Sequence, residues 1–86
     1  MSDERGWFDR PVSVRGIRAG QSIEVSNATQ AADMLLNRWP TITGNGHIEA
    51  RRAVLKALES HSDAKARAKA RDAFRAAAAE AGILRE

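Results

Sequence analysis

The sequence has no cysteine, which excludes a disulfide scaffold, a thiolate nucleophile and any zinc site that needs a cysteine ligand. It also has no run of about 18 apolar residues, the length that a membrane-spanning helix needs. The N-terminal segment MSDERGWFDR is charged and contains no apolar run, so we expect no secretory signal. These absences favour a cytoplasmic protein with no membrane partner.

Aromatic residues are scarce, at 5% of the 86 residues, and much of the 43% hydrophobic share is alanine. Alanine buries little area, so the core has to depend on a few large side chains. The aromatic ones are Trp7, Phe8, Trp39 and Phe74. We expect a single small domain, residues 1–86, with residues 1–7 as a mobile tail. A core this small is often supplemented by oligomerisation, so a homodimer is one expectation.

Charge is unevenly placed along the chain. The net charge is +3, from 14 basic and 11 acidic residues. Up to residue 45 the charges cancel, so the whole excess lies beyond that point, and much of it between Lys65 and Arg75.

Two segments near the N-terminus alternate apolar and polar residues, as half-buried strands do. Val12 and Val14 share one face of PVSVRGI, and Ile23 and Val25 share one face of QSIEVS. Gly20 lies between them and can turn the chain, so the pair predicts an antiparallel hairpin. Because an isolated two-stranded sheet is marginal in water, its outer edge could pair with a second copy.

After the hairpin the apolar period becomes helical. SNATQAADMLLNRW predicts a first helix with Ser26 as its N-cap and Pro40 as its stop. Its apolar stripe consists of Ala28, Ala31, Ala32, Leu35, Leu36 and Trp39. Gly44–Gly46 is expected to turn the chain into a second helix, from about His47 to Glu59.

A third, alanine-rich helix follows, capped by Ser62 or Asp63 and ended by Gly82. Phe74 is the one large side chain on its apolar face. The predicted fold class is therefore α+β: an N-terminal antiparallel β-hairpin followed by three α-helices.

These segments together resemble a known family. The relevant stretches are PVSV with IEVSNATQAADMLLNRWP, then Gly46-His47 running into EARRAVLKALES, then ARDAFRAAAAEAGI. In this order, over roughly residues 8–84, the chain resembles the bacterial domain of unknown function 982 family. The resemblance implies small stand-alone proteins with a hairpin followed by helices, and it carries over no catalytic residue. The chain departs from the family where Ser60-His61 replaces a glycine that often follows the second helix.

The loop before the second helix is a candidate anion site. A glycine-bearing turn that leads into a helix N-terminus can bind an anion, and the residues concerned are Gly46, His47 and Arg51. The loop lacks both the Lys-Ser/Thr of a P-loop and the three glycines of a dinucleotide fingerprint, and Asn-Gly pairs are ordinary turn formers. We therefore interpret it first as a connector and keep the anion site as the alternative.

Catalytic and metal sites find little support in the sequence. His47 and His61 are the only histidines, and no cysteine can complete a ligand set. We predict no catalytic residue, no metal and no cofactor.

The third helix carries the main basic feature. Arg67, Arg71 and Arg75 follow an i, i+4 row and form one ridge, while Lys65 and Lys69 lie on another side. Contact with the phosphate backbone of a nucleic acid is the functional interpretation. A solvated face that keeps an alanine-rich helix soluble is the favoured one, because acidic residues interrupt the patch.

The sequence thus favours a non-enzymatic module that acts through protein contacts, as a regulatory accessory protein with an unknown protein partner or a second copy of itself. The alternative is a nucleic-acid-binding protein that uses the basic third helix. Strong, salt-sensitive binding to nucleic acid would distinguish the alternative from the favoured function.

Overall fold

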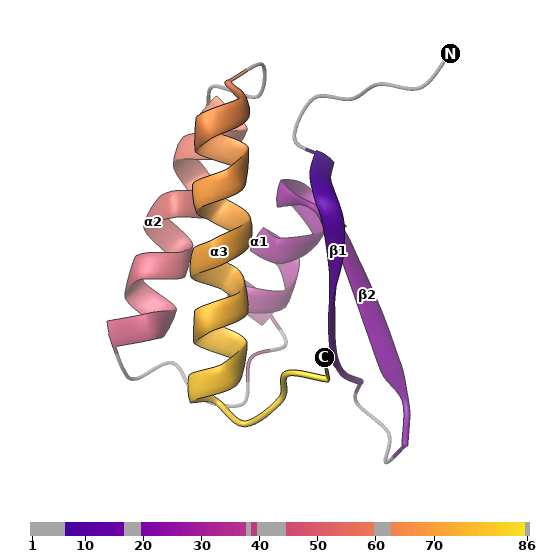
Figure 1. The fold of residues 1–86 in the computed structure, drawn as a ribbon. Helices are drawn as coiled ribbons and strands as arrows, with labels where there is room; N and C mark the ends of the chain where they lie inside the picture. The colour runs from indigo at the N-terminus through magenta and orange to yellow at the C-terminus, as the bar shows by residue number, and fades with distance from the viewer. Residues whose placement is uncertain (1–6, 17–19, 38, 40–44, 60–62, 86) are drawn as a thin grey trace.

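The fold is a two-stranded antiparallel hairpin followed by three helices (Figure 1), which confirms the predicted fold class. The computed structural model describes residues 7–16, 20–37, 39, 45–59 and 63–85. The elements are β1 (Trp7–Arg15), β2 (Ser22–Asn27), α1 (Ala28–Asn37), α2 (Asn45–Glu59) and α3 (Ala64–Glu80).

The hairpin lies on one side of the molecule, and α2 lies on the side away from it (Figure 1). Helix α1 packs on β2 and helix α3 packs on β1, while α2 contacts both of these helices. The apolar face of the hairpin therefore gains its stability from two helices, as a sheet of two strands requires.

The period-two pattern of the strands is confirmed. Val12 and Val14 on β1 and Val25 on β2 are fully buried, and Val12 pairs with Val25 in the sheet. Strand β1 begins earlier than the sequence predicts, at Trp7, and its register shifts between Trp7 and Val12. The turn contains Gly20 with φ +80°, a conformation that favours glycine.

The C-terminal segment closes the outer edge of β1, which the sequence does not predict. The Arg15 N–H donates to the Ile83 carbonyl at 2.7 Å, and the Arg85 N–H donates to the Ser13 carbonyl at 2.8 Å. Leu84 forms an isolated bridge with Val14. This part of β1 is therefore already paired within the chain, and pairing with a second copy has to use β2 instead.

Strand β2 has the exposed edge of the sheet. In an antiparallel pair alternate residues direct their N–H and C=O to one side. Ser13 and Arg15 of β1 bond to the C-terminal segment, so Val12 and Val14 are the residues that bond to β2, at Val25 and Ile23. Ser22 and Glu24 of β2 therefore direct their main-chain groups outward. The next outward N–H, that of Ser26, donates to the Gln30 side chain at 2.7 Å.

The N-cap of α1 is Asn27 and not Ser26, so that prediction is wrong by one residue. The Asn27 side chain accepts from the Gln30 N–H at 2.8 Å, while the Gln30 side chain accepts from the Ser26 N–H. Each of these two side-chain oxygens accepts from a backbone N–H near the start of the helix, as in a capping box. Helix α1 ends at Asn37, so Trp39 lies just beyond it.

The ends of α3 follow the prediction. Asp63 is the N-cap, and its side chain accepts from the Lys65 and Ala66 N–H groups at 2.9 and 3.3 Å. Gly82 follows the helix with φ +75°. Helix α2 begins at Asn45, so Gly46 lies in its first turn and not in the preceding connection.

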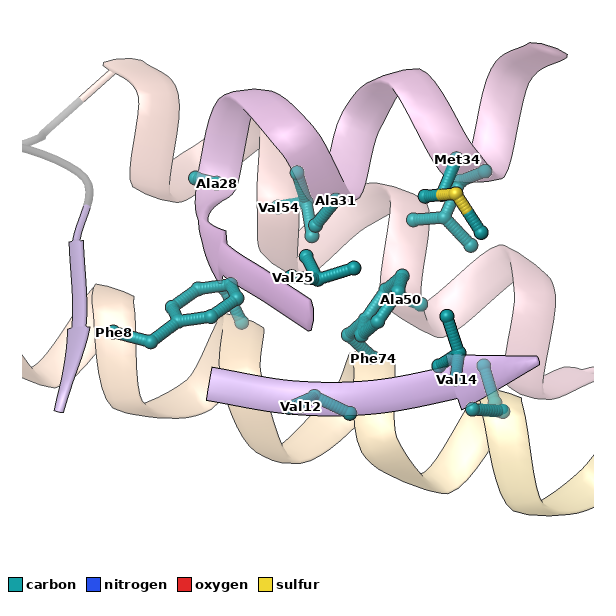
Figure 2. Close-up of a cluster of buried hydrophobic side chains, with 14 of the residues drawn as sticks. Phe8, Val12, Val14, Val25, Ala28, Ala31, Met34, Ala50, Val54 and Phe74 are labelled. Carbon is teal, nitrogen blue, oxygen red and sulfur yellow. The ribbon is translucent and has the colours of Figure 1, made fainter. Parts of the chain in front are cut away.

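Figure 2 shows the core, in which valines of both strands face alanines of the helices and Phe74. Phe74 is fully buried, as predicted, and its ring lies 5.4 Å from that of the half-buried Trp39. The prediction for Leu36 is wrong. The predicted stripe places Leu36 in the core, but its side chain is 59% exposed, and Met34 is buried instead.

Four predictions fall on residues outside the described ranges. They concern most of the tail at 1–7, the helix stop at Pro40, the first glycine of the Gly44–Gly46 turn and the Ser60-His61 connection. Only Trp7 of the predicted tail is described, as the first residue of β1.

Candidate functional site

The first turn of α2, the predicted anion site, already has an anionic group from the protein itself. The Gly46 N–H donates to Oε1 of Glu80, at the end of α3, over 3.3 Å. A carboxylate at a helix N-terminus is favoured by the unpaired N–H groups and by the helix dipole. The structure therefore places a carboxylate of the protein where the sequence predicts an anion bound from solution.

His47, the second predicted residue of this site, is buried, with 3% of its surface exposed. Its Nε2 lies 2.9 Å from the carbonyl oxygen of Leu35, in the last turn of α1. A carbonyl only accepts, so Nε2 carries the proton, and in the neutral ring Nδ1 is an acceptor. Nδ1 is buried and has no hydrogen-bond partner in the described part of the chain. An acceptor of this kind does not bind an anion.

Arg51, the third predicted residue, is exposed one turn further along α2. It lines a small depression between α1 and α2, of about 10 Å³, which we call the apolar groove. The lining residues are Ala32, Leu35, Leu36, Arg51, Val54 and Leu55. Arg51 is the one polar residue among them, so the groove combines an aliphatic lining with a single positive charge.

Large aliphatic side chains remain exposed on the two helices of this groove: Leu36 and Leu55 line it, and Ile48 lies outside its lining. Leu36 is 59% exposed on α1, and Leu55 and Ile48 are 49% and 43% exposed on α2. Ile48 and Leu55 are seven residues apart, so they lie on the same side of α2. Among the residues that the structure describes, these are the large hydrophobic side chains with the greatest exposure, and exposed apolar patches often mark interaction sites.

A second surface forms between β1 and α3, and it contains the predicted basic ridge. Its lining residues are Arg10, Ala64, Arg67, Ala68, Arg71, Asp72 and Arg75. We call this open hollow, of about 470 Å³, the arginine groove. The structure brings the three predicted arginines together and adds Arg10 from the hairpin, so the described lining holds four guanidinium groups and one carboxylate.

Arg71 is fixed in the middle of this groove. Its Nε donates to the main-chain carbonyl of Arg10 over 2.9 Å, which connects α3 to β1. Its Nη1 lies 3.8 Å from Oδ1 of Asp72. The side chain is 20% exposed, and the bond to the Arg10 carbonyl holds its guanidinium at the edge of the groove.

The lysines of α3 lie on a different surface, as predicted. Lys65 and Lys69 line a hollow toward α2, together with Lys56. Asp63 and Asp72 line the same hollow, so three positive charges there meet two negative ones. The arginine groove has the larger excess of positive charge.

The described part of the chain contains no cluster of three or more histidine, cysteine, aspartate or glutamate side chains that could hold a metal ion. Nor does any described helix have the length and apolar character that crossing a membrane requires.

Sequence reasoning missed three contributors to these surfaces. Arg10 joins a ridge 57 or more positions away in the chain, which only the packing of β1 on α3 reveals. Glu80 reaches α2 through the same kind of tertiary contact. Leu36 fits the helical period of the core, and no signal in the sequence separates it from the buried positions.

A family model described as "Protein of unknown function (DUF982)" matches residues 10–85, nearly the whole chain. Comparisons with curated proteins and with solved structures find no match. The matched residues take in most of β1 and all of β2, α1, α2 and α3.

Proposed function

The chain belongs to this family, and from that premise we propose that it is a non-enzymatic protein-interaction module, a regulatory accessory protein that binds a partner helix in the apolar groove. The observation that carries the proposal is the exposure of Leu36, Leu55 and Ile48 along α1 and α2. In a chain with few large hydrophobic residues, three aliphatic side chains on one surface are a large share to leave in water.

The exposed aliphatic side chains and the single positive charge favour an amphipathic helix as the partner. Two neighbouring helices with an apolar cleft between them are a common receptor for the apolar face of a third. Arg51 lies within the cleft, and burying its charge without a partner is costly. A fitting helix therefore carries a carboxylate beside its apolar residues.

A second copy of the chain fits this groove less well. The described residues that line the groove include no acidic one, so a symmetric pairing through them offers Arg51 no carboxylate. This difference favours a partner of another sequence.

The non-enzymatic part of the proposal is supported by His47. It is the one histidine among the described residues, and its Nε2–H is committed to the Leu35 carbonyl in the interior. A general acid or base has to reach its substrate, and this ring does not face solvent.

The test compares proteins captured by tagged variants in a native-host lysate. Leu36→Glu and Leu55→Glu place a charge in the groove, and Ala76→Glu places the same charge on the exposed face of α3. We expect one or more partners that bind the wild type and Ala76→Glu but lose at least tenfold in recovery with both groove variants. Equal recovery by all variants would contradict the proposal.

A second candidate function is nucleic-acid binding through the arginine groove. The observation that favours it is Arg10, which joins the ridge formed by α3 and raises the local positive charge. An electrophoretic shift at two salt concentrations tests it, since binding through phosphates weakens steeply with salt.

A further inference from the structure

We propose that the arginine groove binds the phosphodiester backbone of double-stranded nucleic acid and does not read its sequence. The inference rests on the second candidate function and names its ligand. It uses a different surface from the apolar groove, so the two proposals can hold or fail separately.

Spacing along α3 supports contact with a row of phosphates. Arg67, Arg71 and Arg75 are four residues apart, and at 1.5 Å per residue their Cα atoms span about 12 Å. One strand of B-form DNA advances about 3.4 Å along the helix axis per phosphate, and its phosphates are further apart along the winding backbone, so each arginine of the ridge can face one phosphate. Arg10 approaches the same hollow from β1.

The shape of the surface also suits a duplex backbone. The hollow is open, and its small residues, Ala64 and Ala68, leave room between the arginines. A sugar-phosphate backbone is a convex ridge, which a groove of positive charge accommodates. Arginine offers several donors in a planar fork that matches phosphate oxygens.

Arg71 is already oriented before any ligand arrives. The bond from its Nε to the Arg10 carbonyl, at 2.9 Å, fixes the plane of the guanidinium. A fixed donor loses less conformational entropy on binding than a free surface side chain does. Arg71 should therefore lose little conformational freedom when it contacts a phosphate.

The described lining of the groove offers no group that reads bases. Among the residues that the structure describes there, none is an aromatic side chain for stacking and none is an asparagine or glutamine to bond a base edge. Proteins that prefer single strands rely on aromatic platforms. The groove thus favours a duplex over a single strand, without sequence preference.

The experiment is a fluorescence-anisotropy titration of the full chain with two 20-base-pair duplexes of unrelated sequence, from 50 to 200 mM salt. Four phosphate contacts give a slope of log K against log salt of about −3.6, so affinity falls about 150-fold over this range. We expect the same slope for both duplexes.

Variants show whether the salt dependence of binding arises from the arginine groove. Arg67→Gln, Arg71→Gln and Arg10→Gln should each reduce the slope by about 1, so that affinity falls only about 40-fold over the same salt range. Lys69→Gln is the matched control, because it removes the same charge from the other side of α3 and should leave the slope unchanged. Asp72→Asn removes the one carboxylate of the groove and should raise affinity. Circular dichroism confirms that each variant is folded.

Three results would overturn the inference. A single strand that binds as tightly as the duplex removes the duplex claim but leaves nucleic-acid binding intact. Absence of any nucleic-acid binding at 50 mM salt removes both the duplex claim and the second candidate function. Displacement of the duplex by an equal charge concentration of polyglutamate indicates an acidic polypeptide as the ligand instead.

Discussion

The carboxylate of Glu80, at the end of α3, lies against the first turn of α2, with Oε1 3.3 Å from the backbone nitrogen of Gly46. The two residues are 34 positions apart in the chain, so the contact ties the end of one helix to the start of another. It supplies the negative charge that a helix N-terminus favours.

Removing this carboxylate should destabilise the fold. We expect Glu80→Ala to lower the free energy of unfolding by about 0.5–1 kcal/mol, because the first turn of α2 loses both an acceptor and a favourable charge. Glu80→Gln keeps an acceptor oxygen and should lose less. Urea unfolding followed by circular dichroism measures both, and equal stability of all three proteins would show that the contact contributes nothing.

Gly46 and Glu80 should also be energetically coupled. Glycine inside a helix is normally about 1 kcal/mol less favourable than alanine. At Gly46, however, an added Cβ would lie 3.0 Å from the Glu80 carboxylate, which would have to move. Gly46→Ala should therefore stabilise the Glu80→Ala protein more than the wild type. A double-mutant cycle with a coupling below about 0.3 kcal/mol would contradict this prediction.

His47 should matter for stability and not for ligand binding. Replacing it with leucine removes the donor to the Leu35 carbonyl and leaves that acceptor without its partner, at a cost of about 1–3 kcal/mol. Glu49→Leu, an exposed position in the same region of α2, is the control and should change stability by no more than about 0.5 kcal/mol. Chemical denaturation of the two variants makes the comparison. A His47→Leu protein as stable as the control would show that the hydrogen bond is dispensable.

The sequence predicted the fold well because its signals are local. Alternating valines define the strands, and Asp63 and Gly82 define the ends of α3 through short-range hydrogen bonds and a positive φ. The error at Ser26 has the same origin: two neighbouring residues can both cap a helix, and Asn27 has the geometry in this chain.

The surfaces depend on tertiary contacts, which no local pattern contains. The Arg67, Arg71 and Arg75 ridge follows from helical spacing, but its fourth member, Arg10, comes from β1. Leu36 has the same period as the buried residues of α1, and only the placement of α2 shows that it is exposed. At the first turn of α2, where the sequence predicts an anion site, the structure places the carboxylate of Glu80, which no local pattern indicates.

A homodimer through the hairpin stays a prediction, and the exposed edge of β2 is the edge that it would use. A two-fold pairing of this edge centred on Glu24 sets the two Glu24 side chains opposite each other, and like charges across strands are destabilising. Glu24→Gln should therefore strengthen any such association. Sedimentation equilibrium of both proteins tests it, and an equally monomeric Glu24→Gln protein at high concentration would remove the edge-paired dimer.

The most direct test of the proposed function is site-specific photo-cross-linking in the native host, from position 36 in the apolar groove and from position 76 on the exposed face of α3. We predict that position 36 cross-links to an amphipathic helix of one partner protein, within a turn of an acidic residue, and that position 76 does not. The same cross-linked products from both positions, or products formed only with a second copy of the chain, would contradict the assignment of the apolar groove as the binding surface.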